Sequence, residues 1–327
     1  MTTADIDTLL PKLHQLREAL GQAVVGQHAV VEQLLIGLLA GGHCLLEGAP
    51  GLGKTLLVRS LGQALELQFR RVQFTPDLMP SDILGTELLE EDHGTGHRHF
   101  RFQKGPIFTH LLLADELNRT PPKTQAALLE AMQERTVSYA GTTYMLPAPF
   151  FVLATQNPIE QAGTYPLPEA QLDRFLLHVR VDYPTEQEER DILLQTTGSA
   201  AGTVPQVMHA EDVLALQAAV RQVHVSDDVL TWITRVVRAS RPGSGAPDAV
   251  NHWIKWGAGP RAGQSLVLAA KARALLQGRF AATREDVQAL VGPVMRHRLL
   301  LSFAAEAEQK SADDVIHALL QAVPFPA

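Results

Sequence analysis

Apolar residues follow two different spacings along the first half of the chain. Short continuous or alternating runs predict strands over residues 43–47, 69–74, 111–116, 150–155 and 175–181. Apolar residues that recur every three or four positions predict helices between the strands, and the clearest set is Val30, Val31, Leu34, Leu35, Leu38 and Leu39. Strands that alternate with helices predict an α/β fold, in which a mostly parallel sheet lies between helices.

The second half of the chain shows only helical patterns after Tyr183-Pro184. Capping residues mark the starts of several of these helices. They are Thr185 with Glu188, Ser226, Thr283 with Asp286, and Ser311 with Asp314. We therefore expect an α/β domain over residues 1–182 and an all-helical domain over residues 183–327.

Two segments interrupt the α/β pattern with the features of hairpins. Residues 84–108 contain strand-like pieces around Gly94-Thr95-Gly96, and residues 136–146 turn near Ala140-Gly141. Exposed side chains expected on these hairpins, Tyr139, Tyr144, His97 and Arg98, would suit contact with another protein. The alternative is that the hairpins only complete the edge of the sheet.

The segment Gly48-Ala49-Pro50-Gly51-Leu52-Gly53-Lys54-Thr55 has the sequence of a phosphate-binding P-loop. It lies between a predicted strand and a predicted helix, which is the context that the motif requires. Glycines let backbone N–H groups curl around an anion, and the helix N-terminus adds positive potential. Lys54 is expected to reach the β- and γ-phosphates, and the Thr55 hydroxyl to hold Mg²⁺. The motif predicts binding of a nucleoside triphosphate.

An acidic pair, Asp115-Glu116, ends the apolar run that begins at Leu111. Neighbouring residues of a strand point to opposite sides, so we expect different roles for the two carboxylates. Asp115 suits the Mg²⁺ shell, and Glu116 suits the polarisation of an attacking water. Beside a P-loop, this pair predicts an ATPase.

Composition narrows the class of protein further. The chain has 327 residues, a hydrophobic content of 46% and one cysteine, Cys44. No apolar stretch approaches the length of a membrane span, and residues 1–10 do not have the pattern of a signal peptide. A single cysteine fits a reducing cytoplasm. The net charge of −7 argues against a dedicated nucleic-acid binder.

Motifs along nearly the whole chain resemble those of the MoxR family of AAA+ ATPases. They are Val24-Val25-Gly26-Gln27, the P-loop, Phe74-Thr75-Pro76-Asp77-Leu78, Ala114-Asp115-Glu116-Leu117-Asn118-Arg119, Pro121-Pro122-Lys123-Thr124-Gln125, Ala154-Thr155-Gln156-Asn157-Pro158, Gly163-Thr164-Tyr165-Pro166-Leu167-Pro168-Glu169-Ala170-Gln171-Leu172-Asp173-Arg174-Phe175 and Gly259-Pro260-Arg261. Leu117 stands where the family usually has Ile. The resemblance implies an AAA+ core with an all-α lid, ATP and Mg²⁺ as cofactors, and a homo-oligomer, expected to be a hexameric ring with ATP between neighbours.

The resemblance also implies roles for single residues. Asn157 corresponds to sensor 1, Arg174 to the arginine finger donated to the neighbouring subunit, and Arg261 to sensor 2 on the lid. Val25 and Gly26 lie where the family holds adenine through backbone contacts.

Simpler readings of these residues stay open on the sequence alone. Asn157 precedes Pro158 and has the preference of a turn residue. Arg174 could instead pair with Asp173 or Glu169 of its own subunit, and Arg261 could be a solvated helix residue. Arg119 is a second candidate for a contact across a subunit interface.

The function implied by the resemblance is that of a chaperone-like remodeller, which uses ATP turnover to assemble or activate protein complexes. Its expected partner carries a von Willebrand factor A domain. A DNA-processing motor and a slow nucleotide-gated scaffold are the alternatives. The acidic charge balance opposes the first alternative, and the presence of Glu116, Asn157 and Arg174 opposes the second.

Three histidines, His93, His97 and His99, lie in the first hairpin segment. Because no cysteine or carboxylate triad accompanies them at ligand spacing, we expect a solvated loop there and no metal site.

Overall fold

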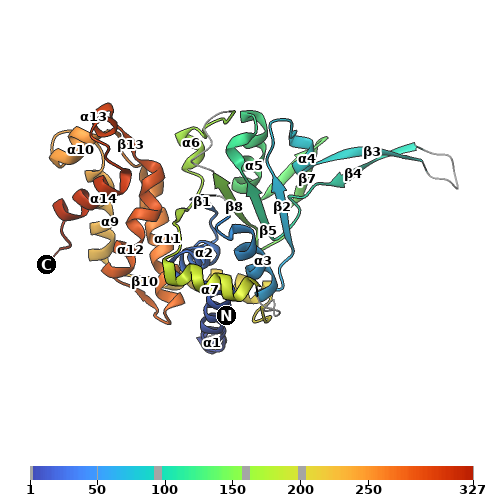
Figure 1. The fold of residues 1–327 in the computed structure, drawn as a ribbon, viewed down its shortest axis with the longest axis horizontal. Coiled ribbons are helices and arrows are strands. Elements are labelled where there is room, and N and C mark those ends of the chain that lie inside the picture. Colours follow the sequence, from blue (N-terminus) through green and yellow to red (C-terminus); the bar gives the residue numbers. More distant parts are fainter. Residues whose placement is uncertain (1–2, 50, 92–97, 157–162, 198–203, 327) are drawn as a thin grey trace.

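A five-stranded parallel sheet forms the centre of the first domain in the computed structural model, which describes residues 3–49, 51–91, 98–156, 163–197 and 204–326 (Figure 1). The strand order is β2-β5-β8-β1-β9, and every neighbouring pair is parallel. The strands are β1 (Cys44–Gly48), β2 (Phe69–Gln73), β5 (Leu111–Asp115), β8 (Phe151–Gln156) and β9 (Leu177–Val181). All five predicted strands are therefore confirmed.

Alternate residues of these strands face two different layers of helices. Cys44, Leu46 and Leu113 share a core with α1 (Thr3–Ala23), α2 (His28–Leu39) and α3 (Lys54–Ala64). Leu45 and Leu112 belong to a second core, with α4 (Pro80–Leu84) and α5 (Pro122–Glu134). The α/β fold with a sheet covered on both faces is thus confirmed, since strand side chains alternate between faces.

The second domain is helical, as predicted. Its helices are α7 (Glu186–Thr197), α8 (Ala210–Gln222), α9 (Asp227–Ala239), α10 (Asp248–Trp253), α11 (Pro260–Leu276), α12 (Arg284–Met295), α13 (Phe303–Ala307) and α14 (Ala312–Ala322). The predicted caps form: Thr185 with Glu188 at α7, Ser226 at α9, Thr283 with Asp286 at α12 and Ser311 with Asp314 at α14. Whether the domains divide at residues 182 and 183 stays a prediction.

Four short strands add to the helical domain. β10 (His224–Val225) pairs with β12 (Ala281–Ala282), and β11 (Ile254–Trp256) pairs with β13 (Leu300–Leu301). These strands were not predicted, because two or three residues do not establish a strand period. Helix α1, whose Leu13, Leu16 and Leu20 are buried, was not predicted either.

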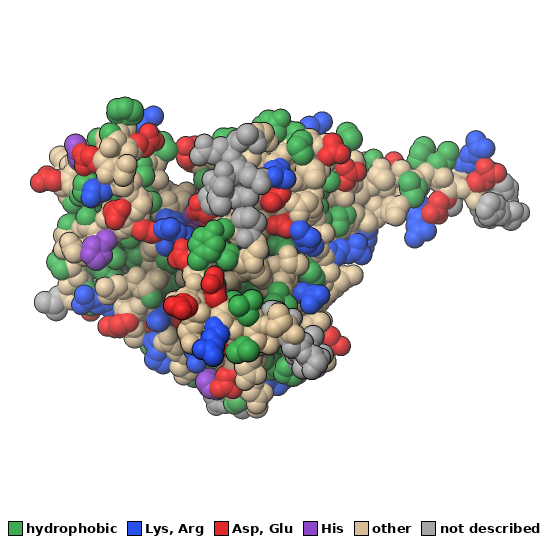
Figure 2. Space-filling model, in the orientation of Figure 1, with side chains coloured by type: hydrophobic (Ala, Val, Ile, Leu, Met, Phe, Trp, Pro, Cys, Tyr) green, Lys and Arg blue, Asp and Glu red, His purple; other side chains and the backbone are tan. Residues whose placement is uncertain are grey.

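Both predicted hairpins form. β3 (Gly85–Glu91) and β4 (Arg98–Lys104) make an arm that projects from the body of the molecule (Figures 1 and 2). β6 (Thr136–Tyr139) pairs with β7 (Thr142–Met145) beside the base of that arm. The turn at 94–96, together with His93 and His97, lies outside the described residues, as does the side chain of His99.

Tyr139 and Tyr144 are not the exposed contact residues that the sequence analysis expected. Their rings stack on Phe102 of β4, with centroid distances of 5.1 Å for Tyr139 and 4.5 Å for Tyr144. A stacked arrangement covers one face of each ring. The tyrosines therefore join the two hairpins, whereas Phe100 of β4 is 69% exposed.

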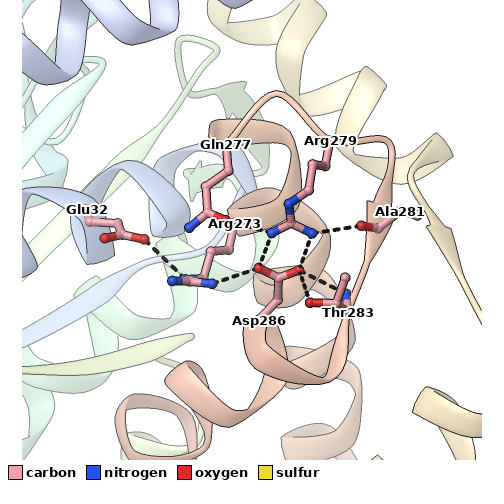
Figure 3. Close-up of polar contacts among 7 residues, drawn as sticks. All are labelled: Glu32, Arg273, Gln277, Arg279, Ala281, Thr283 and Asp286. Carbon is pink, nitrogen blue, oxygen red and sulfur yellow. Dashed lines mark hydrogen bonds and ion pairs between the residues drawn. The ribbon is translucent and has the colours of Figure 1, made fainter.

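A partly buried ionic network joins the two domains (Figure 3). Arg273 of α11 pairs with Glu32 of α2 at 3.1 Å and with Asp286 of α12 at 2.8 Å, and Arg279 pairs with Asp286 at 2.6 Å. Burial alone would raise the pKa of Asp286, but hydrogen bonds from Arg279, Thr283 and Arg273 outweigh it and lower this pKa. Arg273 therefore ties the lid to the core, because it bridges Glu32 of the core and the completely buried Asp286 of the lid.

In the part of the chain that the structure describes, no helix is both long enough and apolar enough to cross a membrane.

Candidate functional site

The P-loop lies where β1 ends, beside the carboxyl ends of β5 and β8. A cavity of about 270 Å³ opens there. Its lining includes Gly48, Gly51, Leu52, Gly53, Lys54 and Thr55 of the P-loop, Arg71 and Gln73 of β2, Asp115 and Glu116, and Thr155 and Gln156 of β8. The crevice at the carboxyl ends of parallel strands is the general ligand-binding position of α/β sheets.

Glycines give the P-loop its shape. Gly51 and Gly53 have φ angles of 84° and 73°, which a side chain would disfavour, and Gly53 directly precedes α3. Gly48 lies so close to β9 that an added Cβ would be 2.5 Å from the carbonyl oxygen of Val181. Ala49 is buried, and Pro50 lies outside the described residues.

Lys54 stands at the first turn of α3 and faces the cavity. Its Nζ donates a hydrogen bond to the carbonyl oxygen of Gly48. Burial lowers the pKa of Lys54, while the nearby charges of Asp115 and Glu116 act in the opposite direction. A partly desolvated ammonium group beside open backbone N–H groups is suited to bind phosphate.

Asp115 ends β5 inside the cavity with two kinds of partner. Its Oδ1 accepts a hydrogen bond from Thr155 Oγ1 at 2.6 Å, and its Oδ2 accepts from Arg71 Nη2 at 2.7 Å. The Asp115 carboxylate and the Thr55 hydroxyl line the same cavity and are oxygen donors of the kind that Mg²⁺ prefers. The residues present fit the predicted metal, which Thr55 and Asp115 would hold, and this ligand pair stays a prediction.

Glu116 shares the cavity with Asp115, although the strand pattern predicted opposite sides. The chain leaves β5 at Glu116, whose φ of 56° turns the backbone into the left-handed region. Thr155 Oγ1 accepts from the Glu116 N–H at 2.8 Å. The Glu116 carboxylate accepts from Gln73 Nε2 at 2.6 Å and pairs with Arg119 at 3.2 Å. The two acids thus have different partners within one site.

The predicted base-binding residues, Val25 and Gly26, line a separate hollow beside α7. Asp191, Leu194 and Gln195 of that helix form its other wall. Gln27 connects this segment to the P-loop, because its Nε2 donates to the carbonyl oxygen of Leu52 at 2.7 Å. No motif in the sequence marks the contribution of α7.

Arg174 and Arg261 do not line the P-loop cavity. Both line a second cavity of about 220 Å³, which also includes His43, Arg135 and Arg298. His43 and Leu176 directly precede β1 and β9, so this cavity lies at the amino ends of the strands, opposite the P-loop. Within the residues that the structure describes, Arg174 forms no ion pair, and Asp173 pairs instead with Arg298 at 2.6 Å.

Asn157 lies outside the described residues, so its role stays a prediction. Arg71, Gln73 and Thr155 are site residues that the sequence analysis missed. Thr155 could have been found, because it ends an apolar run one position before Gln156-Asn157. Nothing local marks Arg71 and Gln73, whose positions depend on the pairing of β2 with β5.

Comparison with known proteins agrees with this geometry. Residues 43–177 match the model of the ATPase family associated with various cellular activities (AAA), and residues 248–319 match that of the AAA lid domain.

Several relatives match over almost the whole chain. Chaperone MoxR1 of Mycobacterium tuberculosis is 42% identical over 97% of this chain and 84% of its own length. Protein MoxR of Paracoccus denitrificans is 34% identical over 94% of this chain and 95% of its own length. The crystal structure of a candidate ATPase from Cytophaga hutchinsonii, 39% identical, superposes with a TM-score of 0.91 over 99% of this chain and 98% of that one. The chain belongs to the MoxR family of AAA+ ATPases.

Proposed function

We propose that the protein hydrolyses ATP to ADP and phosphate in sites shared between neighbouring subunits of a ring, expected to be a hexamer. One observation carries this proposal. The carboxyl ends of the strands carry one group of residues, Lys54, Thr55, Asp115 and Glu116. The amino ends of the strands carry the other, Arg174 and Arg261. A subunit therefore holds the phosphate-binding half of a site on one side and a cationic half on the other.

Each group has a distinct task in this proposal. Lys54 and the backbone of the P-loop bind the phosphates, and Thr55 and Asp115 hold Mg²⁺, which neutralises phosphate charge. Val25, Gly26 and α7 enclose the base. Glu116 accepts a proton from the attacking water, and Asn157 orients that water as sensor 1.

The neighbouring subunit completes the site. Its Arg174 and Arg261 stabilise the charge that develops on the transferred phosphoryl group, since guanidinium groups stay charged and grip oxygens bidentately. Placing Arg261 in this trans role extends the expectation that it acts as sensor 2.

The work done by turnover is proposed to be the remodelling of a protein client, together with a partner that carries a von Willebrand factor A domain. The β3–β4 arm supports this, because it carries exposed apolar side chains, Leu88, Leu89 and Phe100, away from the ATP site. The net charge of −7 argues against the alternative of a DNA-processing motor, because binding to DNA depends on basic side chains that neutralise phosphates. A cytoplasmic location stays a prediction.

The chemistry is tested with two variants of the P-loop edge. Lys54→Ala is expected to abolish tight ATP binding, and Glu116→Gln to bind ATP but hydrolyse it about 10²–10⁴-fold more slowly, as for loss of a positioned base. ATP affinity and turnover are measured for both. Wild-type turnover by Glu116→Gln would remove the role assigned to Glu116.

The shared site is tested by mixing inactive subunits. Arg174→Ala keeps an intact P-loop, and Lys54→Ala keeps an intact Arg174, so mixed rings contain some complete sites. Turnover is expected to recover in mixtures but not in either variant alone. Absence of recovery in mixtures shown to co-assemble would mean that Arg174 does not act in trans.

A further inference from the structure

Arg298 is a buried arginine of the lid whose contacts converge on the segment that carries Arg174. It belongs to a short 3₁₀ helix, residues 296–298, after α12, and its side chain is only 2% exposed. Its Nε donates to Asp173 Oδ1 at 2.6 Å. Its Nη2 donates to the carbonyl oxygens of Phe175 at 2.7 Å and Asp173 at 3.2 Å. Both neighbours of Arg174 in the chain are therefore held by one guanidinium.

The same side chain reaches two helices of the lid. Its Nη1 donates to the carbonyl oxygen of Val294 in α12, and its Nη2 approaches Ser265 Oγ of α11 at 3.3 Å. Ser265 lies one helical turn after Arg261. Arg298 thus connects the segment of Arg174 with the helix that presents Arg261.

A buried charge with this many partners is costly unless every contact is formed. Burial lowers the pKa of Arg298, and the hydrogen bond and charge of Asp173 act in the opposite direction. A rigid fork of five N–H donors can hold several acceptors in one arrangement, which a lysine cannot. Because the acceptors come from separate segments, the guanidinium fixes how those segments lie relative to one another.

We propose that Arg298 is a positioning residue, which holds Arg174 and Arg261 in the arrangement that completes the ATP site of the neighbouring subunit. The inference rests on the proposed trans role of Arg174. Arg298 does not itself reach the phosphates, since its donors are occupied by its own subunit. Because Arg298 belongs to the lid, the position of Arg174 relative to the neighbouring ATP site depends on the position of the lid.

The test compares Arg298→Met and Arg298→Lys with a matched control, Arg296→Met. Arg296 belongs to the same 3₁₀ helix and is partly buried, but it contacts Asp313 at 3.1 Å and the carbonyl oxygen of His178 at 2.9 Å. We expect Arg298→Met to lower the turnover of assembled rings by about tenfold or more, because misplacing a catalytic group by about 1 Å can cost about 10²-fold. The KM for ATP should change by less than about threefold, since the substitution leaves the P-loop cavity of each subunit unchanged.

Mixed rings separate positioning from general damage. Combined with Lys54→Ala, which supplies an intact Arg174, Arg298→Met should regain turnover through its own P-loop. Combined with Arg174→Ala, which needs Arg174 from its neighbour, it should not. Arg296→Met should restore turnover to Arg174→Ala.

Several outcomes would overturn the proposal. One is recovery of Arg174→Ala by Arg298→Met to the level reached with Lys54→Ala. Another is an equal loss of turnover in Arg296→Met and Arg298→Met at matched ring assembly. If Arg298→Met does not fold, Arg298→Lys is used in the same mixtures with the same expected asymmetry. Failure of the Arg174→Ala and Lys54→Ala mixture would instead refute the trans role itself, so the two failures are distinguishable.

Discussion

At the level of single residues, both carboxylates of the acidic pair are held by side chains of β2. Gln73 donates to Glu116 at 2.6 Å, and Arg71 holds Asp115. Gln73→Ala should release Glu116 for the attacking water. An exposed interaction of this kind is worth up to about 1 kcal/mol, so steady-state turnover should rise about two- to fivefold.

Arg70→Ala is the matched control for Gln73→Ala, since Arg70 lies on the same strand but does not line the cavity. Its turnover should equal that of the wild type. A fall in turnover for Gln73→Ala would show that Gln73 supports Glu116 during catalysis.

His43 gives a residue-level prediction about pH. Burial lowers the pKa of His43 to about 4. The hydrogen bond to the Met132 carbonyl raises this pKa, and the charge of Arg135 lowers it further. The unfolded chain, with its ordinary pKa near 6.5, takes up the proton first. The free energy of unfolding should therefore fall as the pH drops from about 6.5 to about 4, by at most about 1.4 kcal/mol per pH unit for this group.

Urea unfolding between about pH 7 and about pH 5 measures this slope. His43→Gln should show a shallower slope, although His297, whose pKa is also lowered mainly by burial, contributes in the same direction. Equal slopes in the wild type and His43→Gln would contradict the assignment.

At the level of secondary-structure elements, one ring joins the two hairpins. Phe102 of β4 stacks on both Tyr139 of β6 and Tyr144 of β7. Phe102→Ala should lower the free energy of unfolding by about 1–3 kcal/mol, since it removes both stacked pairs and leaves a gap. Thermal melting measures the effect.

Phe100→Ala is the control on the same strand, because that ring is 69% exposed. Its stability should change by less than about 0.5 kcal/mol. If the arm contacts another protein, Phe100→Ala should capture a von Willebrand factor A domain partner less well. Phe100→Ala, unlike Phe102→Ala, should do so while keeping both its stability and its turnover. Equal destabilisation by the two variants would refute the joining role of Phe102.

For the whole molecule, the network around Asp286 stabilises the lid and links it to the core through Arg273 and Glu32 (Figure 3). Asp286→Ala would leave Arg273 and Arg279 without their shared carboxylate. Breaking a buried pair costs about 3–5 kcal/mol, and the 36% exposure of Arg279 places the expected loss near the lower value.

Glu32→Gln removes only the link from the core. The Glu32 side chain is 29% exposed, so the expected loss is below about 1 kcal/mol. Hydrogen exchange should then accelerate where α2 meets α11, while α12 remains protected. Equal losses for Asp286→Ala and Glu32→Gln would show that the network acts only between the domains.

The amino-acid sequence by itself determined the features that depend on neighbouring residues. Strand and helix periods located all strands of the main sheet, and capping pairs such as Thr283 with Asp286 located helix starts. The P-loop and the acidic pair were recognisable because their chemistry is concentrated in a few consecutive residues. Local backbone preference and side-chain alternation are enough for such features.

Only the tertiary structure decided which separated residues meet. The order β2-β5-β8-β1-β9 brings Gln73 to Glu116, and the parallel pairing of β1 with β9 places Arg174 at the end of the sheet opposite Lys54. The same folding stacks Tyr139 on Phe102 and buries Arg298 against Asp173. These contacts depend on strand order and domain packing, which are set by the burial of the whole apolar surface and leave no pattern among neighbouring residues.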